Sequence, residues 1–510
     1  MLIRRTNRLF PGKLFLSLFF AACLTVPLMA ADTPPGKQPA AEESDQKPEF
    51  PKKSKLIILK KGTREVKAGE FKGYTNLRKV VLPPGVTTIG ANAFSGCKSL
   101  EDIEIPNTVT KIDKNAFEGC TRLVSIKLPS GLKEIPEGLF KNCTGLMRIQ
   151  IPAQVETIGK GAFEGCTRLA SVTFPGKLTG IGEEAFKNCS MLNDVKLPSG
   201  LTDLGGKAFY GCLSLSSIYI PRGVTEWNHN PFAFCPRLTI TLAPQHPAFE
   251  QFKGIIYNKE RNTVLYYSPQ KRANTYVPPK QITTIGAGAF SGCSYLRAVA
   301  VPATLETIQE EAFSHCRNLA AVKFINQEAV LEKGVFTGCV SLRSIVLPAK
   351  ITELPDSLFS GCTGLAQVKL PPGLEKIGEG TFEQCRSLKT IVLPKSLTSI
   401  GKEAFANCSL LEKIILPDSV TDLAPGTFKG CVRLQDIQLS AGLTVIKENT
   451  FTGCVQLRRL TLPKSVESVE QGAFDKCERL TKVLTLNPEM EDDPNVFTGK
   501  IKLVRPRKRR

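Results

Sequence analysis

The sequence predicts a repeat solenoid, a right-handed superhelix of about 18 coils of 23 residues with short parallel strands and one hairpin insertion. Three observations support this. Cysteines recur at a constant interval, the apolar pattern around each cysteine repeats with it, and the register breaks only once. The cysteines 23 residues apart are Cys97, Cys120, Cys143, Cys166, Cys189, Cys212 and Cys235, then Cys293, Cys316, Cys339, Cys362, Cys385, Cys408, Cys431, Cys454 and Cys477.

The N-terminus has the pattern of an export signal. Basic residues precede an apolar run from Leu14 to Ala30 that is interrupted by Pro27 and ends in small residues. We therefore expect residues 1–30 to be a signal peptide and residues 31–54 a disordered linker rich in Pro, Lys and Glu, so that the protein is secreted or surface-located. The alternative is a lipid anchor on Cys23, which follows two alanines.

The coil from Cys97 to Cys120 illustrates the local chemistry. Alternating Ile103 and Ile105 predict a short strand with one apolar face, and Pro106 ends it because proline supplies no N–H. Ala116-Phe117 then point inward at helix-like or turn-like spacing, and Gly119 permits the tight bend into the next coil.

A single coil cannot fold alone. Burial of about six large apolar side chains contributes roughly 10–15 kcal/mol, whereas ordering the backbone costs about 1–2 kcal/mol for each residue. Stacking buries both faces of each coil and adds a parallel strand ladder at about 4.8 Å per coil. The repeat therefore predicts two stacks, residues 55–235 and 279–499, joined through an insertion at 236–278.

The run Leu-x-x-Ile-x-Leu-Pro-x-x-Leu-x-x-Ile-Gly-x-x-Ala-Phe-x-Gly-Cys, nearly complete between Leu388 and Cys408, resembles the BspA-like, or treponemal-type, leucine-rich repeat over about residues 55–503. The resemblance implies a secreted or surface bacterial protein that recognises proteins or cells, as some adhesins do. We accordingly expect an exported, adhesin-like leucine-rich-repeat scaffold that binds extracellular matrix or cell-surface proteins. The alternative is a structural cell-envelope protein without a selective ligand.

The sixteen repeat cysteines are expected to be free, buried thiols. One cysteine per coil in the same inward register forms a ladder of small apolar side chains, and their parallel orientation is unfavourable for the dihedral angle of a disulfide. No Cys-x-x-Cys pair occurs, and the three histidines are not spaced for zinc. His315 replaces the glycine that precedes cysteine, so we expect it to be a turn residue.

The sequence predicts no enzyme and no cofactor. It contains no nucleophile elbow, phosphate-binding loop, dinucleotide fingerprint or calcium loop. Carboxylate pairs such as Glu310-Glu311 lie at variable repeat positions, where we expect solvated faces rather than a catalytic cleft.

The insertion is the first candidate for partner binding. Cys235 and Cys293 are farther apart than two repeats, and two β-like runs between them flank a polar turn, which predicts a hairpin. Aromatic residues on such an insertion favour a binding surface, although the hairpin would equally serve as a splint between the two stacks. The candidates are Phe252, Tyr257, Tyr266, Tyr267 and Tyr276, four of them among the eight tyrosines of the chain.

The second candidate is the exposed position between the two buried residues of each strand. Early coils carry polar residues there, but Ala300, Val346, Val392 and Ile415 occupy it later. Aligned in successive coils, they would form an apolar stripe suited to a protein partner. The alternative is that β-branched residues simply favour strands.

The third candidate is the basic tail, residues 500–510, which supplies seven positive charges of a chain with net charge +20. We expect either a solvated tail or attachment to an anionic polysaccharide or lipid surface, rather than to nucleic acid. The residues concerned are Arg505, Arg507, Lys508, Arg509 and Arg510.

Overall fold

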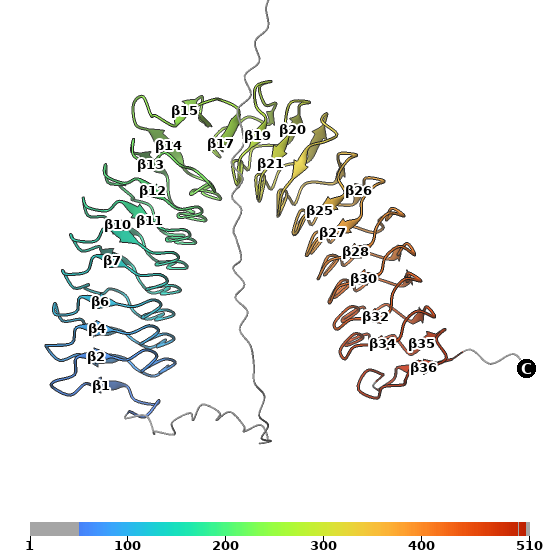
Figure 1. The fold of residues 1–510 in the computed structure, drawn as a ribbon, viewed down its shortest axis with the longest axis horizontal. Helices are drawn as coiled ribbons and strands as arrows, with labels where there is room; N and C mark the ends of the chain where they lie inside the picture. The colour runs from blue at the N-terminus through green and yellow to red at the C-terminus, as the bar shows by residue number, and fades with distance from the viewer. Residues whose placement is uncertain (1–49, 498, 506–510) are drawn as a thin grey trace, which may run out of the picture. The chain divides into compact units, whose positions relative to one another are not determined.

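The computed structural model describes residues 50–497 and 499–505. The proposed signal peptide, Cys23, residues 31–49 of the linker and the last five residues of the tail lie outside this part of the chain. Described residues form a parallel-strand solenoid of about 19 turns without a helix, which confirms the predicted architecture. Figure 1 shows the coils stacked one beside the next in sequence order.

The longer strands form one side of each coil, the long-strand ladder. Partners pair in parallel and lie one repeat apart over most of the ladder, as Val80 and Ile103 do. Their central residue is buried and its neighbours are mostly exposed. The strands are β1 (Leu56–Ile58), β3 (Lys79–Val81), β5 (Asp102–Glu104), β8 (Arg148–Gln150), β10 (Ser171–Thr173), β13 (Ser217–Ile220), β14 (Thr239–Leu242), β18 (Thr275–Tyr276), β20 (Ala298–Val301), β22 (Ala321–Phe324), β24 (Ser344–Val346), β26 (Gln367–Lys369), β29 (Lys413–Ile415), β31 (Asp436–Gln438), β33 (Arg459–Leu462), β35 (Lys482–Thr485) and β36 (Lys502–Val504).

Two-residue strands form a second side, the short-strand ladder, with one exposed or half-buried residue followed by one buried residue in nearly every coil. The strands are β2 (Glu65–Val66), β4 (Thr88–Ile89), β6 (Lys111–Ile112), β7 (Glu134–Ile135), β9 (Thr157–Ile158), β11 (Gly180–Ile181), β12 (Asp203–Leu204), β19 (Thr284–Ile285), β21 (Thr307–Ile308), β23 (Val330–Leu331), β25 (Glu353–Leu354), β27 (Lys376–Ile377), β28 (Ser399–Ile400), β30 (Asp422–Leu423), β32 (Val445–Ile446) and β34 (Ser468–Val469).

Turns form the third side, which we call the turn face. The Phe94 N–H donates to the Ala116 carbonyl of the next coil at 2.8 Å, and the same bond recurs along the stack. Phe94 and Phe117 also stack with ring centroids 5.3 Å apart. The residue before each cysteine has a left-handed backbone, including Gly119 at φ 70° and His315 at φ 56°, so His315 is the predicted turn residue.

Each repeat cysteine is buried and free, as the pattern predicts, and its thiol also makes a contact that the pattern does not reveal. The Cys120 Sγ donates to the Phe94 carbonyl of the preceding coil at 3.3 Å, and Cys362 bonds to the Phe336 carbonyl at 3.0 Å in the same way. All sixteen described cysteines make the equivalent bond to the residue 26 positions earlier. The cysteine ladder therefore ties neighbouring coils together without disulfides.

The insertion forms the predicted hairpin and adds a strand that the sequence did not predict. β15 (Phe249–Phe252) pairs antiparallel with β16 (Ile255–Asn258), which pairs antiparallel with β17 (Thr263–Tyr267). β17 then pairs parallel with β19 and so re-enters the short-strand ladder. The insertion is therefore continuous with the coils that follow it.

Both faces of this hairpin are buried. Ile256 and Tyr266 pack in the apolar core of the N-terminal coils, whereas Ile255 and Tyr267 pack in the core of the C-terminal coils. Alternating side chains of one antiparallel pair thus join two separate cores. The hairpin is therefore a splint between the two stacks, which is one of the two roles that the sequence predicts for it.

Candidate functional site

The long-strand ladder presents exposed apolar side chains in the C-terminal half of the solenoid. Val392 is 86% exposed, Val346 60% and Ile415 47%, while the adjoining residues Ile391, Ile345 and Ile414 are buried. The alternation follows from the two-residue period of a strand. These three candidates therefore lie on one outward-facing surface.

The sequence suggests a continuous apolar stripe, but the described part of the structure does not contain one. Strand pairing places Lys323 beside Ala300 and Lys369 beside Val346, so lysines interrupt the row. Val346 consequently stands alone. The residue at this position varies from coil to coil, and Lys323 and Lys369 separate the apolar residues on either side of Val346.

Val392 and Ile415 are the exception, since they occupy consecutive coils. Thr390 bridges Lys413 in parallel, which puts the two apolar side chains next to one another. They border a groove of about 400 Å³ whose lining also includes Ile391 and Ile414. We call this the Val392–Ile415 groove; its remaining lining residues are Thr390, Leu393, Lys395, Lys413 and Pro417.

The four tyrosine candidates of the insertion are interior residues. Tyr257, Tyr266, Tyr267 and Tyr276 are each at most 8% exposed. The Tyr266 hydroxyl donates to the Leu238 carbonyl at 2.9 Å, and the Tyr267 ring stacks on Phe290 at 4.6 Å. A partner that docks on the folded coils cannot reach these rings. The fifth candidate, Phe252, is 56% exposed and has the Lys253 ammonium 5.2 Å from its ring.

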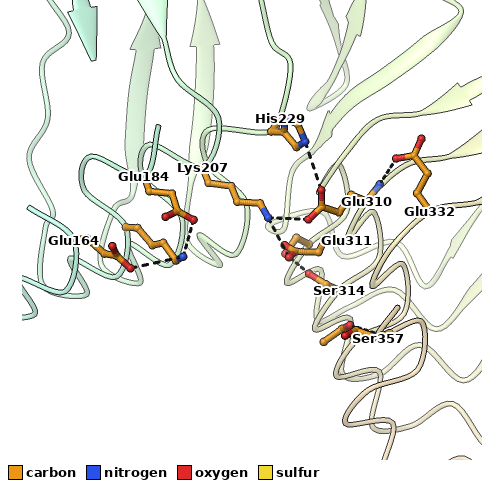
Figure 2. Close-up of polar contacts among 12 residues, drawn as sticks. Glu164, Glu184, Lys207, His229, Glu310, Glu311, Ser314, Glu332 and Ser357 are labelled. Carbon is orange, nitrogen blue, oxygen red and sulfur yellow. Dashed lines mark hydrogen bonds and ion pairs between the residues drawn. The ribbon is translucent and has the colours of Figure 1, made fainter. Parts of the chain in front are cut away.

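Ion pairs connect the turn faces across the insertion. Lys207 Nζ lies 3.2 Å from Glu310 and 3.1 Å from Glu311, residues more than 100 positions away in the sequence (Figure 2). His229 Nε2 approaches Glu310 at 3.5 Å, and Glu332 accepts the Glu310 backbone N–H at 3.0 Å. Two coils separate Lys207 from the glutamates, so the turn faces close on one another where the hairpin is inserted.

The expectation that Glu310-Glu311 forms a solvated face is therefore wrong. Their side chains are only 27% and 26% exposed. Burial alone would lower the pKa of Lys207, but Glu311 and Glu310 together raise it above the usual value. Burial beside Glu311 raises the pKa of Tyr210 to about 12. Local sequence carries no signal for this cluster, because only the insertion brings its members together.

Neighbouring coils extend this polar cluster along the turn face. Lys187 contacts Glu184 at 2.7 Å and Glu164 at 3.7 Å (Figure 2). Every one of these carboxylates except Glu332 faces an ammonium or imidazole partner. In the described part of the chain, no group of three His, Cys, Asp or Glu residues is arranged to hold a metal ion. The cluster is accordingly a structural clamp across the splint.

A second groove, which the sequence did not predict, lies on the long-strand side of the N-terminal coils. It has a volume of about 690 Å³, and most of the residues that line it are polar. The coil that contributes Ser125 to Leu128 forms no regular strand, so the ladder opens between β5 and β8. Its lining includes Lys127, Arg148, Gln150, Gln154 and Thr173.

Of the basic tail, the described part ends at Arg505, whose guanidinium donates to the Met490 carbonyl. Arg507, Lys508, Arg509 and Arg510 lie outside the described residues. Among the residues that the structure describes, no helix has the length and apolar character needed to cross a bilayer.

Comparison with known proteins identifies the repeat. The family model for the BspA type leucine rich repeat region, which holds six copies, matches residues 51–170, 134–252, 265–389 and 353–481. The unmatched residues 253–264 contain β16 and the hairpin turn, so the insertion departs from the family pattern. The search of curated proteins gave no match.

Several solved structures are similar. A leucine rich cell surface protein from Faecalibacterium prausnitzii is 27% identical, with 68% of this chain and 87% of that chain covered and a TM-score of 0.50. A leucine-rich repeat protein from Bacteroides ovatus is also 27% identical, with 84% and 92% covered and a TM-score of 0.33. The T. pallidum leucine rich repeat protein is 26% identical, with 47% and 90% covered and a TM-score of 0.26.

Coil length, the strand–turn order and the Phe-x-x-Cys turn recur throughout the matched residues, and these matches span most of the chain. The chain therefore belongs to the BspA type leucine-rich repeat family and is a repeat scaffold.

Proposed function

We propose that this protein is an exported, adhesin-like scaffold that recognises an extracellular matrix or cell-surface protein through the Val392–Ile415 groove. The observation that carries the proposal is the pairing of two exposed β-branched residues on consecutive coils, where both line one groove. Contiguous exposed apolar groups beside a groove and rimmed by polar residues mark protein interaction sites.

The surroundings of the groove support a protein partner. Lys395 and Lys413 flank the apolar pair, and Lys413 is held by Asp436 at 2.7 Å. A polar rim around an apolar centre excludes water from the centre when a partner docks. The cell-surface description of the Faecalibacterium prausnitzii protein, which is similar over most of its length, agrees with export.

Substitution of both anchors tests the proposal. Val392→Asp with Ile415→Asp places two charges on the groove, and binding to a panel of purified extracellular matrix proteins is measured by biolayer interferometry. We expect at least one matrix protein to bind the wild-type chain, and we expect its affinity to fall by about tenfold or more in the variant, since buried charges without partners disfavour association.

The matched control is Ile58→Asp with Val346→Asp, which changes the same residue types at positions that are each 60% exposed but outside the groove. It is expected to bind like the wild type, and both variants are expected to keep the wild-type melting temperature. Equal affinities for both variants, or no binding to the matrix panel or to a matching panel of purified cell-surface proteins, would overturn the proposal and favour the structural cell-envelope alternative.

A further inference from the structure

The last three strands of the long-strand ladder carry a column of positive charge. Arg459 of β33 pairs with Lys482 of β35, which pairs with Lys502 of β36. Each is the first, exposed residue of its strand. Adjacent strands lie about 4.8 Å apart, so three cations stand in single file over about 10 Å. We call these three residues the cation column.

At two other places in the ladder, a lysine at the equivalent position is neutralised by the strand beside it. Lys79 faces Asp102 at 2.7 Å on β3 and β5, and Lys413 faces Asp436 at 2.7 Å on β29 and β31. None of the three column residues forms an ion pair or a side-chain hydrogen bond with another described residue. Opposite charges stabilise directly paired strand positions and like charges destabilise them. The column is therefore kept at a cost to the stability of the sheet.

Nearby carboxylates form no ion pair with the column among the described residues. Glu412 and Asp436, in the preceding coils, are engaged by Arg433 at 3.9 Å and by Lys413. The acidic segment 489–493 belongs to the connection between β35 and β36 and makes no ion pair with the column within the described chain. Exposed Arg458 precedes Arg459 in the sequence and adds a further positive charge.

We propose that the cation column binds a linear anionic polysaccharide laid along the ladder. A single file of evenly spaced, unpaired cations suits a chain with repeated sulfate or carboxylate groups, whereas a membrane presents a plane of charge. Single-stranded nucleic acid requires aromatic rings for base stacking. The only rings between residues 456 and 505 are Phe474 and Phe497, which are buried and half-buried.

Heparin binding by the full chain tests this site. In the triple variant Arg459→Gln, Lys482→Gln, Lys502→Gln, we expect the affinity for immobilised heparin at 0.1 M NaCl to fall by about tenfold or more, and the slope of log Kd against log salt to decrease, because fewer counterions are released. Melting temperature serves as the folding control and is expected to stay the same or rise, since like charges have been removed.

Two further variants locate the effect. Lys127→Gln, Lys196→Gln, Lys323→Gln removes the same net charge from three exposed lysines on separated coils, and it is expected to bind heparin like the wild type. A tail variant isolates the contribution of the last residues; it carries Arg507→Gln, Lys508→Gln, Arg509→Gln and Arg510→Gln. Adding the three column substitutions to this variant is expected to weaken its remaining heparin binding further.

The proposal is overturned if the dispersed triple weakens heparin binding as much as the column triple, or if only the tail variant has an effect. It is also overturned if oligo-dT or mixed vesicles of phosphatidylserine and phosphatidylcholine, rather than heparin, bind in a column-dependent way. The column lies on β33, β35 and β36, outside the Val392–Ile415 groove, so its failure and that of the proposed protein recognition are distinguishable.

Discussion

At the position of the repeat cysteine, the fold requires three properties in one side chain. It must be small, it must be apolar enough for complete burial, and it donates a weak hydrogen bond. The Phe117 carbonyl accepts the N–H of Cys120 in its own coil at 3.2 Å and the thiol of Cys143 in the next coil at 3.0 Å. The constant spacing predicts burial of the thiol, but the bond to the neighbouring coil depends on how coils stack.

These thiols make the stability of the solenoid sensitive to alkaline pH. Burial raises the pKa of Cys316 and Cys362 from 9.0 to about 12. Thiols of the unfolded chain ionise near the lower value, so the folded state retains protons that the unfolded state loses. The stabilisation is complete below pH 9 and is lost as the pH rises toward 12, by about 1.4 kcal/mol per pH unit for each thiol.

We expect the free energy of unfolding in urea to fall steeply between pH 9 and pH 10.5 under reducing conditions. In the double variant Cys316→Ala, Cys362→Ala, the free energy of unfolding should depend less steeply on pH, because two thiols no longer contribute. Lysine and tyrosine residues titrate in both proteins, so the difference between the two curves reports the thiols alone. An identical pH dependence in both proteins would contradict the assignment. Thiol titration of the denatured, unreduced chain should find all sixteen repeat cysteines free.

At the scale of elements, two breaks in the short-strand ladder fall where the sequence removes a hydrogen-bond donor. Pro136 and Pro355 occupy the position that follows the short strand, where Gly159 and Gly378 donate an N–H to the preceding coil at 2.7 and 2.8 Å. Proline has no N–H to donate. The short-strand ladder accordingly breaks between β6 and β7 and between β23 and β25.

The hairpin is expected to govern stability rather than ligand contact. Tyr266→Ala with Tyr267→Ala removes two buried rings and the hydrogen bond to Leu238, and loss of a large aromatic side chain from a core costs about 3–5 kcal/mol. We therefore expect a large drop in the melting temperature by calorimetry.

Phe252→Ala provides the matched control on the same hairpin, because this ring is exposed. Its melting temperature is expected to lie within a degree or two of the wild type, as surface substitutions usually change stability by no more than about 0.5 kcal/mol. If the double tyrosine variant melted like the wild type, the role of the hairpin as a splint would be wrong.

For the whole solenoid, the hairpin divides the apolar interior into two cores. One contains buried residues from Ile57 to Tyr266 and the other from Ile255 to Val496, with the sequence ranges overlapping only inside the hairpin. In a stack where each coil contacts its neighbours, stability is a sum of coil and interface contributions. The hairpin and the Lys207–Glu310–Glu311 clamp are therefore the interface that couples the two halves.

Hydrogen exchange followed by mass spectrometry should reveal this division. Phe359→Ala empties a fully buried site in the C-terminal core, and we expect amide protection to fall in the coils around it and to remain unchanged before Cys235. Phe140→Ala in the N-terminal core should give the mirror-image pattern. A uniform loss of protection along the chain in either variant would show that the two cores act as one.

The sequence by itself determined the coil: its length, its strand, its proline stop, its Phe–Cys turn and the burial of its thiols. These features recur in coil after coil at a constant spacing. Each residue therefore contacts the equivalent positions of the adjacent coils, and the repeat length already specifies which residues those are. The exposed positions Val346, Val392 and Ile415 were predicted for the same reason.

Tertiary structure alone decided what happens where that register is shifted. The extra residues of the insertion turn its tyrosines inward, because both faces of the hairpin meet an apolar core. They also bring Lys207 to Glu310, 103 positions away, for which no periodic signal exists. Likewise, whether exposed residues join into a groove or a charged column depends on which strands pair, and pairing is a property of the stacked coils rather than of any one of them.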